Sequence, residues 1–325
     1  MLIKKNAKHF NIKHFIEPKE VEFIDINQIN LHPHYYAPEE KDMAIVIPFF
    51  NPTNSVRLVQ NFLFIDNLLQ RANIPVIIIE LAYNNLFITK EIDDNDRHII
   101  HVRSDSVMFH KENLLNIGIN KVIYSKYCIL DADIIFSDLN WYNNLSNLLS
   151  KYDVIQPYQK AYWMALDMKT TIRSKFSVGF NLKARKGKLD HPGFVWGFKR
   201  EWFEKIGNLP EFFISGGSDS ILAHICFGSQ INNYIDSELF NSYLDNCKEI
   251  EFSSNYMNGV IFHLFHGNIE NRQYSERHKK ITRAINRKIY LTKNSDGVLE
   301  WEQDIRTQMN ETFMEYLISR GDDSV

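Results

Sequence analysis

The chain has 325 residues, of which 44% are hydrophobic and 24% charged, and its formal net charge is −3. This is the composition of a globular protein with a sizeable core, and the near-neutral charge argues against nucleic acid as a partner. The three cysteines show no paired spacing, so neither a disulfide framework nor a zinc cluster is expected. No apolar run approaches the ~20 residues of a membrane-spanning helix and no signal peptide is recognisable, so we expect a protein that is cytoplasmic or otherwise soluble.

The sequence predicts three consecutive parts. Residues 1–41 mix charged residues, His and Pro without a sustained period, and we interpret them as an N-terminal extension. Residues 42–268 are expected to form the main domain, with a basic loop at 183–188, and residues 269–325 a helical C-terminal extension. In the main domain apolar runs alternate with helical patterns, which predicts strands at 44–47, 76–79, 99–102 and 127–130 and helices at 55–72 and 111–122. This alternation predicts an α/β fold with a mainly parallel sheet flanked by helices.

Three residues fall at the carboxyl ends of expected parallel strands: Pro48, Glu80 and Asp131. Such sheets bind ligands at that edge, so a nucleotide site is expected there. Glu80 would accept hydrogen bonds from a uracil base or a ribose. A solvated carboxylate at a strand end is almost as common.

Asp131 and Asp133 are separated by one residue, directly after the apolar run 127–130. A divalent cation is the usual means of stabilising the negative charge of a departing diphosphate, and carboxylate oxygens are hard ligands that suit such an ion. The pair is therefore a candidate metal and diphosphate site. The alternative interpretation is a solvated turn between a strand and a loop.

Five ordered segments between about residues 43 and 267 resemble the GT-A glycosyltransferases, most closely the β-1,4-galactosyltransferases and the related family-2 enzymes. Residues 192–200 (PGFVWGFKR), followed by 206–210 (IGNLP), are similar to a glycine-rich segment of those enzymes that ends in I-N-G-F. The other four are residues 45–51 (IVIPFFN), similar to the uridine-binding I-P-F-R-N-R; 109–118 (FHKENLLNIG), similar to F-N-R-A-K-L-L-N-V-G; 131–133 (DAD), similar to D-V-D; and 216–220 (GGSDS), similar to G-G-E-D-D.

The resemblance implies a GT-A, Rossmann-like fold and an enzyme that uses Mn²⁺ or Mg²⁺. It implies transfer of a sugar from a nucleotide sugar, with a UDP-sugar expected, to a hydroxyl of a carbohydrate or glycoconjugate, with inversion. Phe50 replaces an arginine of the uridine segment, so recognition of the base or ribose is expected to differ. The residues expected to bind the donor are Pro48, Phe49, Asn51, Glu80, Lys111, Asp131, Trp196 and Gly217.

Asp219 is the candidate general base, because an inverting transferase needs a carboxylate that accepts the proton of the acceptor hydroxyl. Gly217 leaves backbone room for a sugar ring, and a helix is expected at 220–227, whose N-terminal dipole keeps a carboxylate ionised. The alternative is that Asp219 is only the N-cap of that helix. Ser218 and Ser220 stand where the resembling motif has acidic residues, so the acceptor contacts are expected to differ.

Metal ions in this class take a further ligand from a downstream histidine, and residues 261–267 (IFHLFHG) supply two. Asp131, Asp133 and His266 are the expected metal ligands. Strand alternation places His263 and His266 on opposite faces, which predicts that only one of them reaches the metal. The alternative is a pair of half-buried histidines with hydrogen-bond partners. For Trp196 a core position and a sugar-stacking platform both remain open.

Two other functions remain open. A sugar nucleotidyltransferase would also place aspartates on such a sheet, but it usually opens with a glycine-rich phosphate loop, and none follows Ile47. A carbohydrate-binding protein without catalysis would also fit, because the 216–220 motif is less acidic than in the enzymes it resembles.

Overall fold

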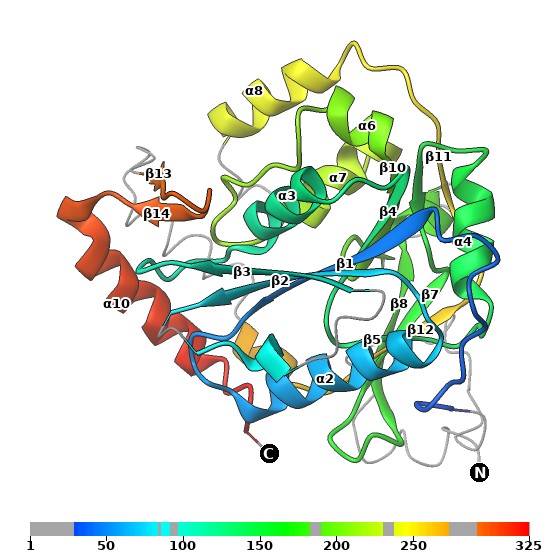
Figure 1. The fold of residues 1–325 in the computed structure, drawn as a ribbon, viewed down its shortest axis with the longest axis horizontal. Helices are drawn as coiled ribbons and strands as arrows, with labels where there is room; N and C mark the ends of the chain where they lie inside the picture. The colour runs from blue at the N-terminus through cyan, green and yellow to red at the C-terminus, as the bar shows by residue number, and fades with distance from the viewer. Residues whose placement is uncertain are drawn as a thin grey trace.

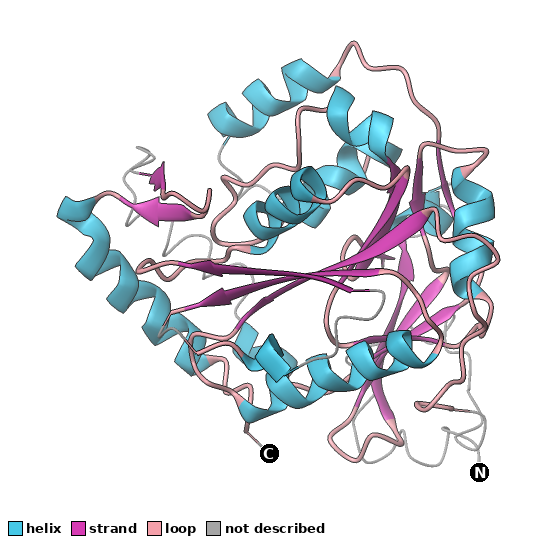
Figure 2. Ribbon diagram, in the orientation of Figure 1, coloured by secondary structure: helices cyan, strands magenta, loops and turns pink. Residues whose placement is uncertain are grey.

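The structure, a computed structural model, describes residues 29–83, 86–91, 97–182, 190–229, 237–272 and 291–324. Most of the expected N-terminal extension and the basic loop at 183–188 lie outside these residues. The described part is an α/β fold in which helices cover both faces of a central sheet (Figures 1 and 2).

The central sheet has seven strands in the order β11-β6-β10-β4-β1-β2-β3. The four strands β4-β1-β2-β3 are mutually parallel, β10 runs antiparallel to β4 and β6, and β11 is parallel to β6. The strands are β1 (Met43–Phe50), β2 (Val76–Ala82), β3 (Arg97–Arg103), β4 (Lys126–Leu130), β6 (Val154–Gln156), β10 (Val195–Lys199) and β11 (Ser254–Tyr256). The expected mainly parallel α/β fold is confirmed, and the arrangement is consistent with the GT-A fold that the resemblance implies.

Both faces of the sheet are buried, as continuous apolar strands require. In β1, Ile45 and Ile47 belong to a core cluster with residues of α2 and α4, whereas Ala44 and Val46 belong to a second cluster with residues of α3, α6 and α7. This division follows from the two-residue period of a strand. The helices are α2 (Val56–Arg71), α3 (Lys111–Lys121), α4 (Trp141–Leu149), α5 (Val178–Phe180), α6 (Arg200–Lys205), α7 (Ser218–Phe227) and α8 (Ser237–Cys247), with a short 3-10 helix, η4 (Ile88–Glu91).

A second sheet places β12, the strand that ends at His263, beside the aspartate pair. Its order is β5-β12-β7-β8-β9, and β5 pairs antiparallel with β12 so that His263 lies opposite Ile134. The strands are β5 (Ile134–Phe136), β7 (Lys160–Met164), β8 (Thr171–Ser177), β9 (Asp190–His191) and β12 (Val260–His263). This pairing places the turn that contains Asp133 beside the end of β12.

The C-terminal segment is only partly helical. It contains η6 (Ile269–Arg272), a hairpin of β13 (Leu291–Lys293) and β14 (Leu299–Trp301), and helix α10 (Gln303–Ser319). The helical expectation is therefore right for α10 and wrong for the hairpin. Trp301 packs with Val107 and Ile214 of the main domain, and its Nε1 donates a hydrogen bond of 3.2 Å to the Val107 carbonyl. The segment thus shares a core with the rest of the molecule, along whose edge α10 runs (Figure 1).

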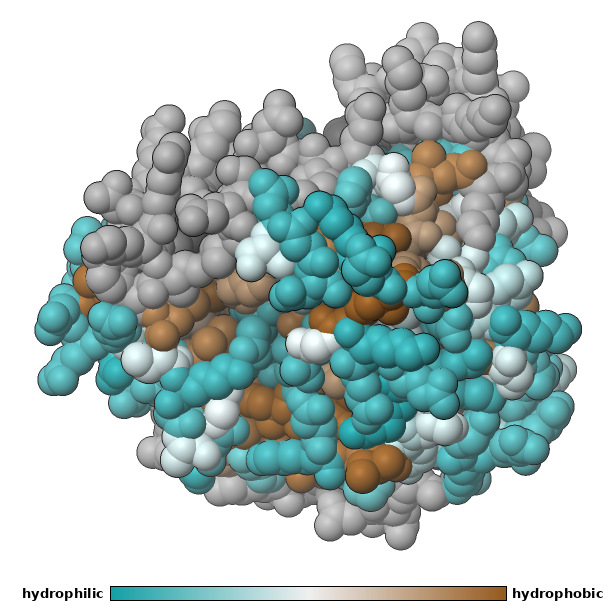
Figure 3. Space-filling model, turned by 90° about the horizontal axis from the view of Figure 1, so that it is seen from above, coloured by the Kyte–Doolittle hydropathy of each residue, from teal (hydrophilic) through white to brown (hydrophobic). Residues whose placement is uncertain are grey.

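Hydrophobic residues on the face shown in Figure 3 form areas interrupted by hydrophilic ones, as is ordinary for a protein surface. None of the helices in the described ranges is long and apolar enough to cross a lipid bilayer.

Candidate active site

Two groups of polar side chains meet where β4 ends. Asp131 follows the last residue of β4, and its backbone N–H donates a 3.0 Å hydrogen bond to the carbonyl of Phe194. Its carboxylate lies 2.7 Å from the Lys111 ammonium, whereas that of Asp133 lies 2.9 Å from Nε2 of His266. The two aspartates thus belong to different groups of side chains.

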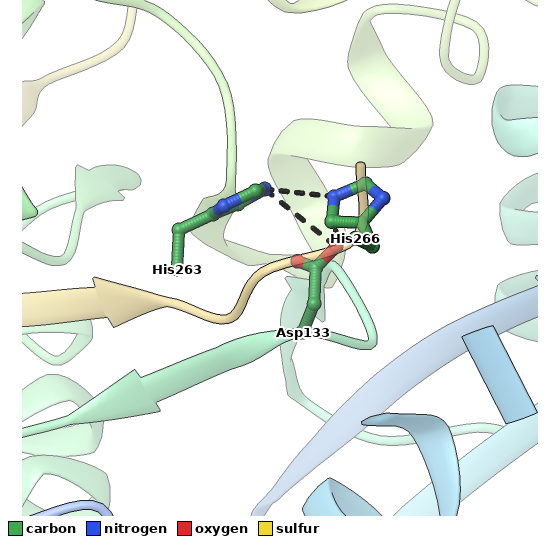
Figure 4. A group of neighbouring side chains, drawn as sticks. All are labelled: Asp133, His263 and His266. Carbon is green, nitrogen blue, oxygen red and sulfur yellow. Dashed lines mark hydrogen bonds and ion pairs between the residues drawn. The ribbon is translucent and has the colours of Figure 1, made fainter. Parts of the chain in front are cut away.

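The first group consists of Asp133, His263 and His266, whose ligand atoms all lie within 4.8 Å of one another. Figure 4 shows both imidazoles turned toward the Asp133 carboxylate. The expectation that the histidines lie on opposite faces is wrong, because β12 ends at His263 and the backbone after it is no longer extended. Leu264 instead donates a 2.8 Å hydrogen bond from its backbone N–H to the carbonyl of Asp133, which brings the chain round so that both rings face the same carboxylate.

The protonation states of this group suit a divalent cation. Burial lowers the pKa of His263 to about 3, so its imidazole is neutral at neutral pH. Burial acts to raise the pKa of Asp133, but the nearby His263, His266 and Arg272 lower it below its ordinary value. Its second oxygen, Oδ1, is buried without a hydrogen-bond partner among the described residues. A carboxylate oxygen without a partner beside two imidazoles is a donor set that metal ions favour, so the residues fit a cation.

Behind His266 lie residues that the sequence did not single out as part of the site. Asp322 has a carboxylate oxygen 3.7 Å from Nδ1 of His266, 3.4 Å from Arg272 and 3.2 Å from Arg320. Arg272 also donates a 3.0 Å hydrogen bond to the His266 carbonyl. No sequence pattern connects His266 with Asp322. In the sequence, Asp322 and Asp323 resemble an ordinary pair of solvent-exposed charges near the end of a helix.

The second group is built on Lys111, the first residue of α3. Its ammonium lies between Asp131 and Asp219, 3.3 Å from the nearer Asp219 oxygen. Burial acts to lower the pKa of Lys111, but Asp131, Asp219 and Glu112 raise it well above its ordinary value, so it is charged. Burial raises the pKa of Asp131 to about 6 although Lys111 acts against this. The ammonium therefore joins the strand carboxylate to the candidate base.

Asp219 does not cap the helix, because α7 begins at Ser218 and its N-cap is Gly217, with φ of 107°. The capping alternative for Asp219 is wrong, and the expected start of the helix at residue 220 is two residues late. Ser218 is buried and donates a hydrogen bond to the carboxyl group of Glu112. Burial raises the pKa of Glu112 to about 7.

The backbone of Gly193 lies close to the candidate base, and only a residue without a side chain fits there without crowding it. A Cβ atom at this position would lie 3.1 Å from Oδ2 of Asp219 and 3.2 Å from Nε2 of His191. The next residue, Phe194, has φ of 84°, which is rare for an aromatic residue, and its ring contacts those of His191 and His263. Strained backbone of this kind clusters at functional sites.

Three other residues that were expected to bind the nucleotide-sugar donor form hydrogen bonds within the protein. Glu80 is buried, and its carboxylate accepts hydrogen bonds from the backbone N–H groups of Ile88 and Thr89 at 2.7 and 3.0 Å. Asn51 bonds to the backbone of Ser55. Trp196 is 1% exposed, and its Nε1 donates to the Pro192 carbonyl at 2.9 Å.

Trp196 therefore occupies a core position, one of the two interpretations of this residue. A role in stacking on a sugar is not supported, because its ring is buried. Phe49 is likewise buried and packs on Phe62, while Pro48 is half-buried near the end of β1. The donor roles of Pro48, Phe49 and Asn51 stay predictions, as does the assignment of Asp131 to the metal.

No protein-family model matches the chain, and no curated protein sequence matches it. Among solved structures, the chain is similar to a mutant of the Drosophila β-1,4-galactosyltransferase 7 in complex with manganese, UDP-Gal and xylobiose. The similarity covers 67% of this chain and 64% of that one, with 11% sequence identity and a TM-score of 0.33. This is a distant likeness, and it assigns no role to any residue of this chain.

Proposed function

We propose that this protein is a metal-dependent glycosyltransferase that moves a sugar from a nucleotide-diphosphate sugar, a UDP-sugar, to a hydroxyl of a glycan or glycoconjugate with inversion. The observation that carries the proposal is the meeting of two groups at the end of β4: Asp133 with two histidines, and Lys111 with Asp131 and Asp219. One group suits a cation and the other suits an anionic leaving group with a nearby base.

The first group would hold the cation through Asp133, His263 and His266. A divalent cation supplies positive charge that stabilises the departing diphosphate. Lys111 supplies a second positive charge on a compact group with three donors, and it is positioned by the carboxylates on either side. A diphosphate oxygen would compete with Asp131 for this ammonium, since charge-assisted hydrogen bonds to phosphate are strong.

Asp219 would accept the proton of the acceptor hydroxyl as that oxygen attacks the anomeric carbon of the donor. The new bond joins the acceptor oxygen to the anomeric carbon, and the bond from that carbon to the diphosphate oxygen breaks, so that UDP leaves. When Lys111 pairs with the diphosphate, its contact with Asp219 would loosen, which frees the carboxylate to meet the acceptor hydroxyl. Gly193 has no side chain, and a Cβ atom there would crowd Oδ2 of Asp219, the proposed base.

The experiment is a screen of nucleotide sugars with the purified protein and Mn²⁺, read as released nucleoside diphosphate, with Asp133→Ala as the inactive control. We expect metal-dependent release for one donor and faster release with an acceptor. Full turnover in excess chelator, or equal turnover by Asp133→Ala, would overturn the proposal.

A carbohydrate-binding protein without catalysis is the second candidate. The observation that favours it is the Lys111 ammonium 3.3 Å from Asp219, because this ion pair occupies the carboxylate that would otherwise meet an acceptor hydroxyl. Binding to a glycan array without turnover of any donor would support this candidate.

A further inference from the structure

One face of the second sheet carries two positive charges near the candidate metal group. His263 of β12 pairs with Trp163 of β7, and Trp163 pairs in turn with Arg173 of β8. Residues that pair across neighbouring strands point to the same face of a sheet, so Arg173 lies on the face of His263, two strands away. Lys175 lies on this face too, because side chains of a strand return to one face at every second residue.

Both cations are half-buried. The central carbon of the Arg173 guanidinium lies 5.2 Å from the centre of the Trp163 ring, a cation–π contact that restricts the direction of the side chain. The Lys175 ammonium donates a 3.1 Å hydrogen bond to the carbonyl of Asp190. Within the described ranges it makes this hydrogen bond alone, and an ammonium has three donors. Lys175 therefore has donors left for a ligand.

The charge of Lys175 is not balanced within the protein. Burial and, less strongly, the neighbouring Arg173 lower the pKa of Lys175 to about 8, although Asp190 acts to raise it. A lysine whose pKa lies below its ordinary value is one whose charged form is disfavoured by its surroundings. An anion bound beside this ammonium would stabilise the charged form.

The two cations are also close to the candidate base. Strand β9 pairs with β8 so that His191 lies on the same face as Lys175. Burial, followed by Lys175 and Arg173, lowers the pKa of His191 well below its ordinary value, so the imidazole is neutral and lies near both charges. Its Nε2 and Oδ2 of Asp219 would lie 3.2 and 3.1 Å from a Cβ atom at Gly193. The imidazole is therefore a neighbour of the cations and of the proposed base.

The chemistry of these cations suits an anionic group of the acceptor. A guanidinium and an ammonium on one face bind carboxylate and phosphate groups through charge-assisted hydrogen bonds. In the proposed reaction the donor diphosphate already has Lys111 and the cation beside Asp133 as counter-charges. The part of the substrate that would lie next to the base is the acceptor.

We propose that Arg173 and Lys175 bind a negatively charged substituent of the acceptor sugar, a carboxylate or a phosphate, so that the protein acts on acidic glycans. The inference rests on the proposed transferase function and names the class of its acceptor. A neutral sugar would leave the Lys175 ammonium without a counter-charge and would bind more weakly.

The test uses an array of immobilised sugars that differ in charge. Hexosides of gluco, galacto and manno configuration are each presented in three forms: the neutral sugar, the uronate and the 6-phosphate. We expect the full chain to bind at least one acidic form about tenfold or more tightly than its neutral counterpart, because hydrogen bonds to charged groups are stronger than those between neutral groups. The comparison of uronates with phosphates shows which anion the site takes.

Three variants test the role of Lys175. Lys175→Met removes the charge and keeps an unbranched side chain, so affinity for the acidic sugar should fall about 10–100-fold. Lys175→Arg keeps the charge and should retain most of the affinity. The matched control is Lys169→Met, which changes an exposed lysine between β7 and β8 and should bind within about threefold of wild type.

Two further measurements separate binding from folding. Because burial disfavours the charged form of Lys175, the Tm of Lys175→Met should not fall below that of Lys169→Met. Added NaCl should weaken the binding of acidic sugars to wild type by screening the attraction, and it should have less effect on Lys175→Met.

The outcomes distinguish this inference from the proposed function. The inference is overturned if neutral sugars bind as tightly as acidic ones, if no acidic sugar binds, or if Lys175→Met binds acidic sugars as wild type does. Metal-dependent release of nucleoside diphosphate would in each of these cases leave the proposed function standing. If acidic sugars bind in a manner that depends on Lys175 but no donor is turned over, the anion site stands and the transferase function fails.

Discussion

The ammonium of Lys111 lies 2.7 Å from a carboxylate oxygen of Asp131, and the same ammonium reaches Asp219 at 3.3 Å. One buried cation thus joins the strand that carries the aspartate pair to the helix that carries the candidate base. This ammonium connects the strand and the helix through two ion pairs, and it would also attract a diphosphate.

Removing this cation should destabilise the fold. Lys111→Met leaves Asp131, Asp219 and Glu112 without their shared positive charge, and loss of one partner of a buried pair costs about 3–5 kcal/mol. Urea unfolding at pH 8 measures the change. The control is Lys248→Met, which removes an exposed ion pair with Asp245 and should change the free energy of unfolding by less than about 0.5 kcal/mol. A Lys111→Met protein as stable as wild type would show that the ion pairs of Lys111 do not contribute to the free energy of unfolding.

Glu112 should make stability depend on pH. Its folded pKa is about 7 and its ordinary value 4.5, so the folded protein holds the proton more tightly. Stability from this group is therefore present below pH 4.5 and is lost as the pH rises to about 7, by about 3 kcal/mol in total. Because Glu112→Gln resembles the protonated form at every pH, wild type should lose stability relative to this variant between pH 5 and 8.

Unfolding by urea at several pH values measures this difference. Glu204→Gln, which changes an exposed carboxylate paired with Arg200, should show no such trend. A constant difference between wild type and Glu112→Gln across the range would contradict the prediction.

Both histidines should contribute to metal binding. Since His263 and His266 face the same carboxylate, we expect His263→Ala and His266→Ala each to raise the Kd for Mn²⁺ by at least about tenfold. His98→Ala, on the exposed side of β3, is the control. Unchanged affinity in His263→Ala would mean that one histidine alone serves the metal, as strand alternation had suggested.

Asp219→Asn should lower the transfer rate about 10²–10⁴-fold, because the amide does not accept the proton of the acceptor hydroxyl. Loss of a helix cap does not account for such an effect, since Gly217 is the N-cap. The Kd for Mn²⁺ should stay near the wild-type value, and the wild-type product should have the inverted configuration. Normal transfer by Asp219→Asn, or a product that retains the donor's configuration, would rule out this role.

Gly193→Ala should reduce transfer without changing metal affinity. The added methyl group would lie 3.1 Å from Oδ2 of Asp219 and 3.2 Å from Nε2 of His191, closer than a Cβ atom ordinarily approaches, so the proposed base would have to shift. A roughly tenfold or larger fall in the transfer rate is expected, since small displacements at a reacting centre are costly. Wild-type transfer rates in this variant would contradict the role proposed for the position of Asp219.

The sequence by itself determined the main elements and the place of the site. Continuous apolar runs such as 44–47 and 127–130 form strands buried on both faces, and the alternation of strands with helices determines a mainly parallel sheet. Because the carboxyl ends of parallel strands share one edge, the position of Asp131 directly after a strand was enough to locate the candidate site.

Only the tertiary structure decided which side chains meet there. The direction of His266 depends on where β12 ends and on the bond from Leu264 to Asp133, which local alternation does not reveal. The approach of Asp322 to His266 depends on the docking of a tail more than fifty positions along the chain. Periodicity reports which face of an element is buried, whereas contacts between distant segments depend on how whole elements pack. For this reason the contacts of the tail and the close approach of Gly193 to Asp219 were visible only in the fold.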